Sequence, residues 1–188
     1  MELFTSICIG IGLAASSGFR IFVPMLVANI AALAGVHNFS GGFEWLNTWT
    51  AFGILLTATV AEIAAYYVPW LDNVLDHIAL PVAIASGTLL SASFIAADIT
   101  PATRWGLGLL AGGGTAAMIH SGMGLLRLGS TALTGGLGNP VVTTAENGAA
   151  VSFSILALFV PVVIAAVVLF MLIFIANKLF SRKRAKVP

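Results

Sequence analysis

Five long apolar regions constrain the fold of this chain more than any other feature of its sequence. A membrane-spanning helix needs about 20 mostly apolar residues, each adding about 1.5 Å of rise. Only 8% of the 188 residues are charged, against about 25% in a typical soluble domain. The sequence therefore predicts an all-α fold, a polytopic transmembrane helical bundle of about five spans. The five regions are Leu3–Ala34, Trp49–Trp70, Ile78–Ala97, Trp105–Leu133 and Ala149–Asn177.

Basic residues gather at the end of the chain and indicate its orientation. Five of the eight Lys and Arg residues lie between Lys178 and Lys186, directly after an apolar region. Lys and Arg are enriched on the cytoplasmic side of membrane helices. We therefore expect a single transmembrane domain over residues 1–177 and a basic cytoplasmic tail over 178–188. The start of the chain lacks the basic region of a secretory signal, so we expect no cleavage. A net charge of +1 gives no reason to expect nucleic-acid binding.

The first and fourth regions each combine small residues with buried charge. The first contains Gly18, Arg20 and Pro24; the fourth contains Gly112-Gly113-Gly114, followed by His120 and Arg127. Glycine weakens a helix and proline removes a backbone donor. Within a membrane, freed backbone groups are tolerated only where protein or water satisfies them. We expect broken or re-entrant helices at both places. The alternative is close packing of straight helices through small residues.

The two halves of the chain, residues 1–98 and 104–177, resemble each other in order and spacing. Three pairs of segments match in the same order, and both members of the last pair end on a glutamate. These matches predict a duplication. With three spans in the first half, the second copy would be inverted, as in many secondary transporters. The three pairs are Gly12–Ala15 with Gly108–Ala111, Ser40–Phe43 with Thr134–Leu137, and Thr59–Glu62 with Thr143–Glu146.

Charges inside membrane spans mark functional sites or structural ion pairs. Glu62 lies eight residues before Trp70, or about 12 Å along a helix. We expect Arg20 to pair with an acid such as Glu62 or Glu146. The pair is either a permanent bridge or one that opens when a substrate or proton competes. Glu146 by itself is interpreted as an acid near a helix N-terminus, and only the inferred repeat raises it above that interpretation.

His120 and Arg127 are seven residues apart and share a helix face. They could line a polar cavity with Arg20, and two arginines suit an anionic group. The alternative for Arg127 is that its side chain extends to a lipid headgroup. Asp98 and Arg104 flank a short connector that we interpret as a surface turn.

An acidic connector follows the second region. Asp72 and Asp76 would share a helical face, with His77 beside them, and such a set could bind a divalent cation or relay protons. Spacing alone favours a solvated connector, because nothing else completes a coordination set. The chain has no hydrolase elbow, zinc-protease motif or nucleotide-binding loop. We therefore expect no enzyme, no metal and no cofactor; an intramembrane metal enzyme is the least favoured alternative.

Several motifs resemble those of an uncharacterised bacterial membrane family, domain of unknown function 4126. The first runs Gly-Leu-Ala-Ala-Ser-Ser-Gly-Phe-Arg-Ile-Phe-Val-Pro-Met-Leu over 12–26. The second extends from Glu62 through Asp72 and Asp76 to Pro81, and a weaker third covers Asn139–Asn147. Tyr66-Tyr67 stands where the family shows Asp-Lys, and a Thr/Arg pattern before Pro81 is absent, so this is a divergent member. The resemblance implies a multi-span protein of the bacterial inner membrane and supplies no activity.

From these features we expect a small secondary transporter or translocator. It would move an anionic or zwitterionic solute or lipid headgroup by alternating access, with Arg20 holding the anion and Glu62 as counter-ion. The alternative is a non-catalytic scaffold or accessory subunit whose charges form fixed bridges. The expected partners are the lipid bilayer, an unidentified solute or lipid, and a second copy of the chain in a homodimer.

Overall fold

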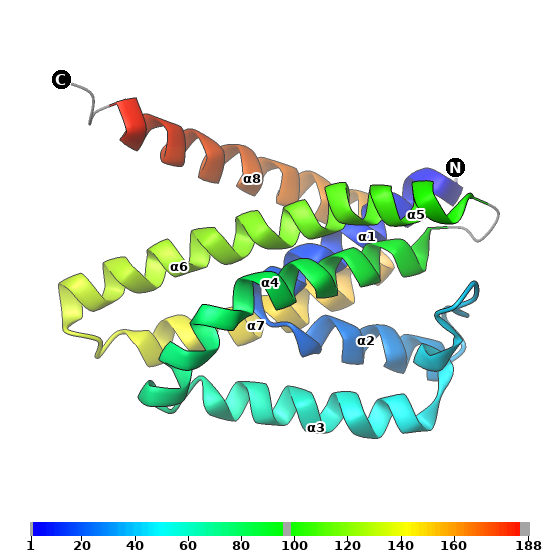
Figure 1. The fold of residues 1–188 in the computed structure, drawn as a ribbon, viewed down its shortest axis with the longest axis horizontal. Helices are drawn as coiled ribbons and strands as arrows, with labels where there is room; N and C mark the ends of the chain where they lie inside the picture. Colours follow the sequence, from blue (N-terminus) through cyan, green and yellow to red (C-terminus); the bar gives the residue numbers. More distant parts are fainter. Residues whose placement is uncertain (1, 96–98, 185–188) are drawn as a thin grey trace.

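The computed structural model describes residues 2–95 and 99–184, which fold into seven main helices lying mostly along one axis (Figure 1). One of the seven, Pro101–Thr134, consists of three consecutive helical segments. Within these ranges there is no β-strand. The helical segments are α1 (Glu2–Phe19), α2 (Phe22–Leu33), the short 3-10 helix η1 (Glu44–Asn47), α3 (Trp49–Ala65), α4 (Pro69–Phe94), α5 (Pro101–Leu107), η2 (Gly108–Gly113), α6 (Gly114–Thr134), α7 (Asn139–Phe159) and α8 (Pro161–Arg184). The all-helical fold predicted from the sequence is confirmed.

The first apolar region is divided, as predicted, into two helices. The chain reverses at Arg20 and Ile21, and α2 runs back to the end of the bundle where α1 begins (Figure 1). Pro24 does not cause this break. It lies in the first turn of α2, where a backbone N–H has no partner within the helix and its loss costs little.

The predicted break at Gly112-Gly113-Gly114 is wrong. The helix is continuous from Pro101 to Thr134, with a π-helical stretch over Gly108–Gly113. The glycines allow close packing instead. A Cβ atom at Gly112 would lie 2.3 Å from the Gly87 carbonyl oxygen of α4. The sequence alternative, small residues at a helix contact, is the correct interpretation here.

Two other boundaries differ from those expected. The region Ala149–Asn177 is divided at Val160, whose backbone leaves the helical region (φ −134°, ψ 58°). The following residue, Pro161, disfavours a helical conformation at Val160. The segment predicted as an acidic connector is helical. Its backbone forms the first turns of α4, with Pro69 at the start of the helix. The side chains of Asp72, Asp76 and His77 lie outside the described residues.

Length and composition point towards a membrane for part of this bundle. Two helices, Pro101–Thr134 and Asn139–Phe159, are long and apolar enough to cross one, with mean hydropathies of 1.2 and 1.4 over their most suitable windows. The bundle also contains shorter apolar helices, namely Leu3–Phe19, Phe22–Leu33, Trp49–Ala65, Ile78–Phe94 and Pro161–Asn177.

The segment between α2 and α3 packs over one end of the bundle, and Arg104 holds it there. Phe39, Phe43 and Leu46 are buried in this segment. The Arg104 guanidinium donates hydrogen bonds to the Ala92 carbonyl oxygen (2.8 Å) and to the carbonyl oxygens of Gly41 (3.1 Å) and Ser40 (3.3 Å). Arg104 is 6% exposed, so the interpretation as a surface residue is wrong. Asp98 lies outside the described residues.

His37, in the same segment, should make stability sensitive to acid. Its ring stacks on Phe94 and packs edge-on against Phe39, and burial lowers the pKa of His37 below its usual 6.5. The folded protein then binds fewer protons than the unfolded chain, so stability should fall as pH drops below about 6.5. We expect thermal melts of the His37→Phe variant to lose less stability than wild type between about pH 7 and about pH 5. Equal losses in the two proteins would contradict this role.

Candidate ligand-binding cavity

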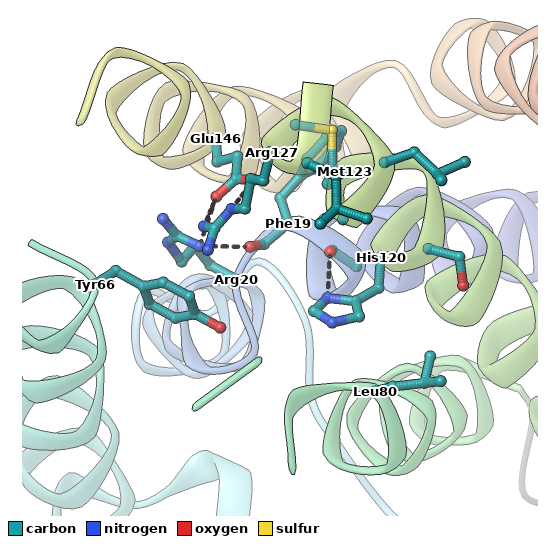
Figure 2. Close-up of a pocket in the computed structure, with 13 residues that line it drawn as sticks. Phe19, Arg20, Tyr66, Leu80, His120, Met123, Arg127 and Glu146 are labelled. Atoms are coloured by element: carbon teal, nitrogen blue, oxygen red, sulfur yellow. Dashed lines mark hydrogen bonds and ion pairs between the residues drawn. The ribbon is translucent and has the colours of Figure 1, made fainter. Parts of the chain in front are cut away.

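A cavity of about 370 Å³ lies beside the break between α1 and α2. Its walls come from α1, α4, α6 and α7, from Arg20 at the break and from Tyr66 directly after α3, so residues far apart in sequence meet there (Figure 2). The described lining residues are Gly18, Phe19, Arg20, Tyr66, Leu80, His120, Ser121, Met123, Gly124, Leu125, Arg127, Leu128 and Glu146.

Arg20 lies at the break and extends towards α7. Its side chain is 1% exposed. Nη1 forms an ion pair with Glu146 Oε2 (2.9 Å) and donates to the Phe19 carbonyl oxygen (3.0 Å). Nε donates to Asn147 Oδ1 (2.6 Å), and Nη2 donates to the Thr143 carbonyl oxygen (3.4 Å). Each guanidinium nitrogen therefore has an acceptor, as a buried cation requires.

Glu146 joins Arg20 to a second arginine. Arg127 Nε donates to Glu146 Oε1 (3.0 Å), and Arg127 Nη2 pairs with Glu146 Oε2. This two-point contact is the geometry in which arginine binds carboxylates most strongly. The Tyr66 ring lies against both cations, with its centroid 4.0 Å from Arg20 Cζ and 4.7 Å from Arg127 Cζ. Such contacts between cations and an aromatic face are attractive, particularly when desolvated.

Glu62 binds backbone rather than the Arg20 guanidinium. Its carboxylate accepts hydrogen bonds from the backbone N–H groups of Ile21 (2.7 Å) and Phe22 (3.0 Å). These donors belong to the start of α2, where N–H groups lack helical partners and a negative charge is favourable. Of the two acids proposed as partners of Arg20, Glu146 makes the direct contact, while Glu62 stabilises the helix that follows.

Side chains from other helices satisfy further backbone groups at the break. His120 Nδ1 on α6 lies 3.3 Å from the Gly18 carbonyl oxygen, and the Ser86 hydroxyl on α4 donates to the Ile21 carbonyl oxygen (3.1 Å). With Glu62 on α3, three helices bind backbone groups at the break, and α7 binds the Arg20 side chain. This arrangement is what a helix break away from water needs.

The structure brings most of the sequence-derived candidates together. Arg20, His120, Arg127 and Glu146 line the cavity, and Glu62 binds the backbone next to Arg20. Of the candidate break residues, only Gly18 lines it. The side chains of Asp72, Asp76 and His77 on α4 lie outside the described residues. Among the residues that the structure describes, no three His, Cys, Asp or Glu side chains are grouped to hold a metal ion.

Sequence reasoning missed the residues that support the arginines. Tyr66 contacts both guanidinium groups, and Asn147 and Thr143 bind Arg20. Tyr66 follows Glu62 by four residues and so falls on the same helix face, which is a usable signal. For Asn147 the signal is weaker, because an amide beside an acid is common in any turn or helix start.

Comparison with known families matches residues 7–180 to a domain of unknown function (DUF4126). No curated protein and no solved structure matches the chain. Because the family match covers nearly the whole sequence, this chain belongs to the DUF4126 family.

Proposed function

We propose that the protein is a small secondary transporter or translocator of the bacterial inner membrane. It moves an anionic or zwitterionic solute or lipid headgroup by alternating access. The observation that carries this proposal is a cavity beside a helix break, lined by two buried guanidinium groups that share one carboxylate. Charged groups at membrane depth most often belong to substrate pathways or to ion pairs that serve them.

The shared carboxylate indicates what the cavity can bind. Arginine presents planar N–H donors that match the oxygens of carboxylates and phosphates. Glu146 already occupies such donors of Arg20 and Arg127. An oxyanion entering the cavity competes with Glu146 for the same donors. That competition couples ligand binding to the contact between α1, α6 and α7.

The bundle suits alternating access in an inverted arrangement. Gly41 and Gly42 have φ values of 65° and 95°, and Gly135 and Gly136 have nearly the same values, 63° and 91°. The two turns lie at opposite ends of the bundle (Figure 1). This likeness supports the repeat inferred between residues 1–98 and 104–177. With the basic tail in the cytoplasm, the start of the chain lies on the outer side.

Arg20→Lys should abolish most transport, because lysine keeps the charge but lacks the planar donor fork. The assay uses purified protein in liposomes, with inorganic phosphate, succinate and fluorescent phosphatidylglycerol as separate probes. We expect at least one probe to move faster than in protein-free liposomes, with a loss of about tenfold or more in Arg20→Lys. Glu62→Gln should also slow the movement of the probe, because a neutral amide accepts the backbone hydrogen bonds at the start of α2 more weakly than the carboxylate does.

Arg104→Lys is the matched control, since Arg104 is a buried arginine outside the cavity. Its effect should be on thermal stability, with the movement of probes by folded protein retained. The proposal fails if no probe moves, or if folded Arg20→Lys and Glu62→Gln proteins move it at the wild-type rate.

A scaffold or accessory subunit is the second candidate. It is favoured by the saturation of Arg20, whose three nitrogens all contact described acceptors. A purely structural ion pair requires only these contacts. On this hypothesis Arg20→Lys lowers the melting temperature, liposomes containing wild type move no probe, and a stoichiometric partner co-purifies with the protein.

A further inference from the structure

The described lining of the cavity has a polar part and an apolar part. Arg20, Arg127 and Glu146 form the polar part, and His120 lies between it and Leu80 (Figure 2). The apolar part consists of Leu80, Met123, Leu125 and Leu128. A small, fully hydrated anion would gain nothing from the apolar part. A ligand that joins an anion to an apolar chain matches both.

The apolar part reaches the outer surface between α4 and α6. Leu80 on α4 is 38% exposed, and Leu125 and Leu128 on α6 are 39% and 68% exposed. Ser121, Leu125 and Leu128 recur at helical spacing and so form one face of α6. In the proposed membrane orientation this flank faces acyl chains. The opening is therefore lateral, towards lipid.

The cavity volume determines which part of such a ligand can enter. At about 370 Å³ it lies near the lower end of the roughly 300–1,000 Å³ of pockets that enclose whole small molecules. It has room for a headgroup and not for two acyl chains as well. The chains can stay in the bilayer while the headgroup enters, which avoids taking them through water.

We propose that the ligand is an anionic lipid, whose phosphate or carboxylate headgroup enters between α4 and α6 and contacts Arg20 and Arg127. This inference rests on the proposed carrier function and names its substrate class. The headgroup oxygens take donors that Glu146 now occupies, so each headgroup entry exchanges one carboxylate for another oxyanion. Free phosphate offers the same oxyanion without the chains.

Two glycines on α6 provide a matched test. A Cβ atom added at Gly124 or at Gly129 meets no heavy atom within 4 Å, yet only Gly124 lines the cavity. Gly124→Leu should fill the headgroup space, whereas Gly129→Leu places the same side chain elsewhere on the same helix. Both changes improve helix propensity to the same extent. A difference between the variants therefore reports on the cavity.

The measurement follows fluorescent phosphatidylglycerol crossing the bilayer of liposomes, with dithionite bleaching the outer leaflet. We expect wild type to speed this movement, Gly124→Leu to slow it by about an order of magnitude, and Gly129→Leu to leave it unchanged. Fluorescent phosphatidylcholine, which carries no net charge, should move more slowly than phosphatidylglycerol. Equal effects of the two glycine variants, or equal movement of the two lipids, would overturn the inference.

Uptake of radiolabelled inorganic phosphate into the same liposomes distinguishes the two sources of oxyanion. If phosphate enters in an Arg20-dependent manner while phosphatidylglycerol does not move, the lipid inference is wrong and the carrier function stands. If phosphate, succinate and phosphatidylglycerol all fail to move, both proposals fail. Thermal melts of each variant establish that the proteins compared are folded, and Gly124→Ala serves as a smaller filling change with an intermediate expected effect.

Discussion

Replacing Glu146 with alanine should lower the free energy of unfolding by about 3–5 kcal/mol, the usual cost of removing one partner from a buried ion pair. The carboxylate is 2% exposed and contacts two arginines. Without it, Arg20 and Arg127, each over the Tyr66 ring, lose the carboxylate that they share. The loss of stability arises mainly from leaving two buried cations without this carboxylate, and less from the lost bond itself.

Thermal melts of detergent-purified protein measure this change. Glu44→Ala is the control, because Glu44 is an exposed carboxylate that accepts hydrogen bonds from the Gly42 backbone N–H. It should shift the melting temperature far less than Glu146→Ala. Glu146→Asp keeps the charge on a shorter side chain and should fall between the two. A melting temperature unchanged by Glu146→Ala would show that the bridge contributes nothing to stability.

The second large effect is expected from Gly112→Ala. The added methyl group would lie 2.3 Å from the Gly87 carbonyl oxygen and 2.5 Å from Ser91 Cβ. Backbone atoms of α4 cannot rotate away as a flexible side chain can. The two helices must move apart, so we expect destabilisation at or above the usual 1–3 kcal/mol for overpacking.

Gly114→Ala is the matched control, two residues along the same helix. A Cβ atom there meets nothing within 4 Å. Alanine also favours a helix over glycine by about 1 kcal/mol, so this variant should melt at or above the wild-type temperature. Melts of both variants in one detergent test the prediction. If Gly112→Ala is as stable as Gly114→Ala, the helices do not pack through this glycine.

Local features of the sequence determined the helices and some of the site residues. Long apolar runs with few charges predict helices because their backbone groups need internal partners. Arg20 and Glu62 stood out because charge is expensive in such runs, and Glu146 stood out because it matches Glu62 in the inferred repeat. The interruption near Gly18 followed from the same reasoning. The division at Val160 was also accessible, since Pro161 marks it, but the surrounding apolar run concealed it.

Only the tertiary structure decided which of these residues meet. Glu62 and Glu146 are similar acids on apolar helices, and no local pattern says which one contacts Arg20; the packing of α7 against α1 does. Gly18 lies within α1, two residues before the chain reverses at Arg20, and Gly112 also lies within a continuous helix. An added Cβ atom would lie 2.8 Å from the Ala116 carbonyl oxygen of α6 at Gly18 and 2.3 Å from the Gly87 carbonyl oxygen of α4 at Gly112. Glycine both weakens a helix and permits close approach of another helix. The nearness of α6 to Gly18 and of α4 to Gly112 shows that close approach is the effect used at both positions. Sequence determines what each segment can form, and contacts between distant segments determine which option has the lower free energy.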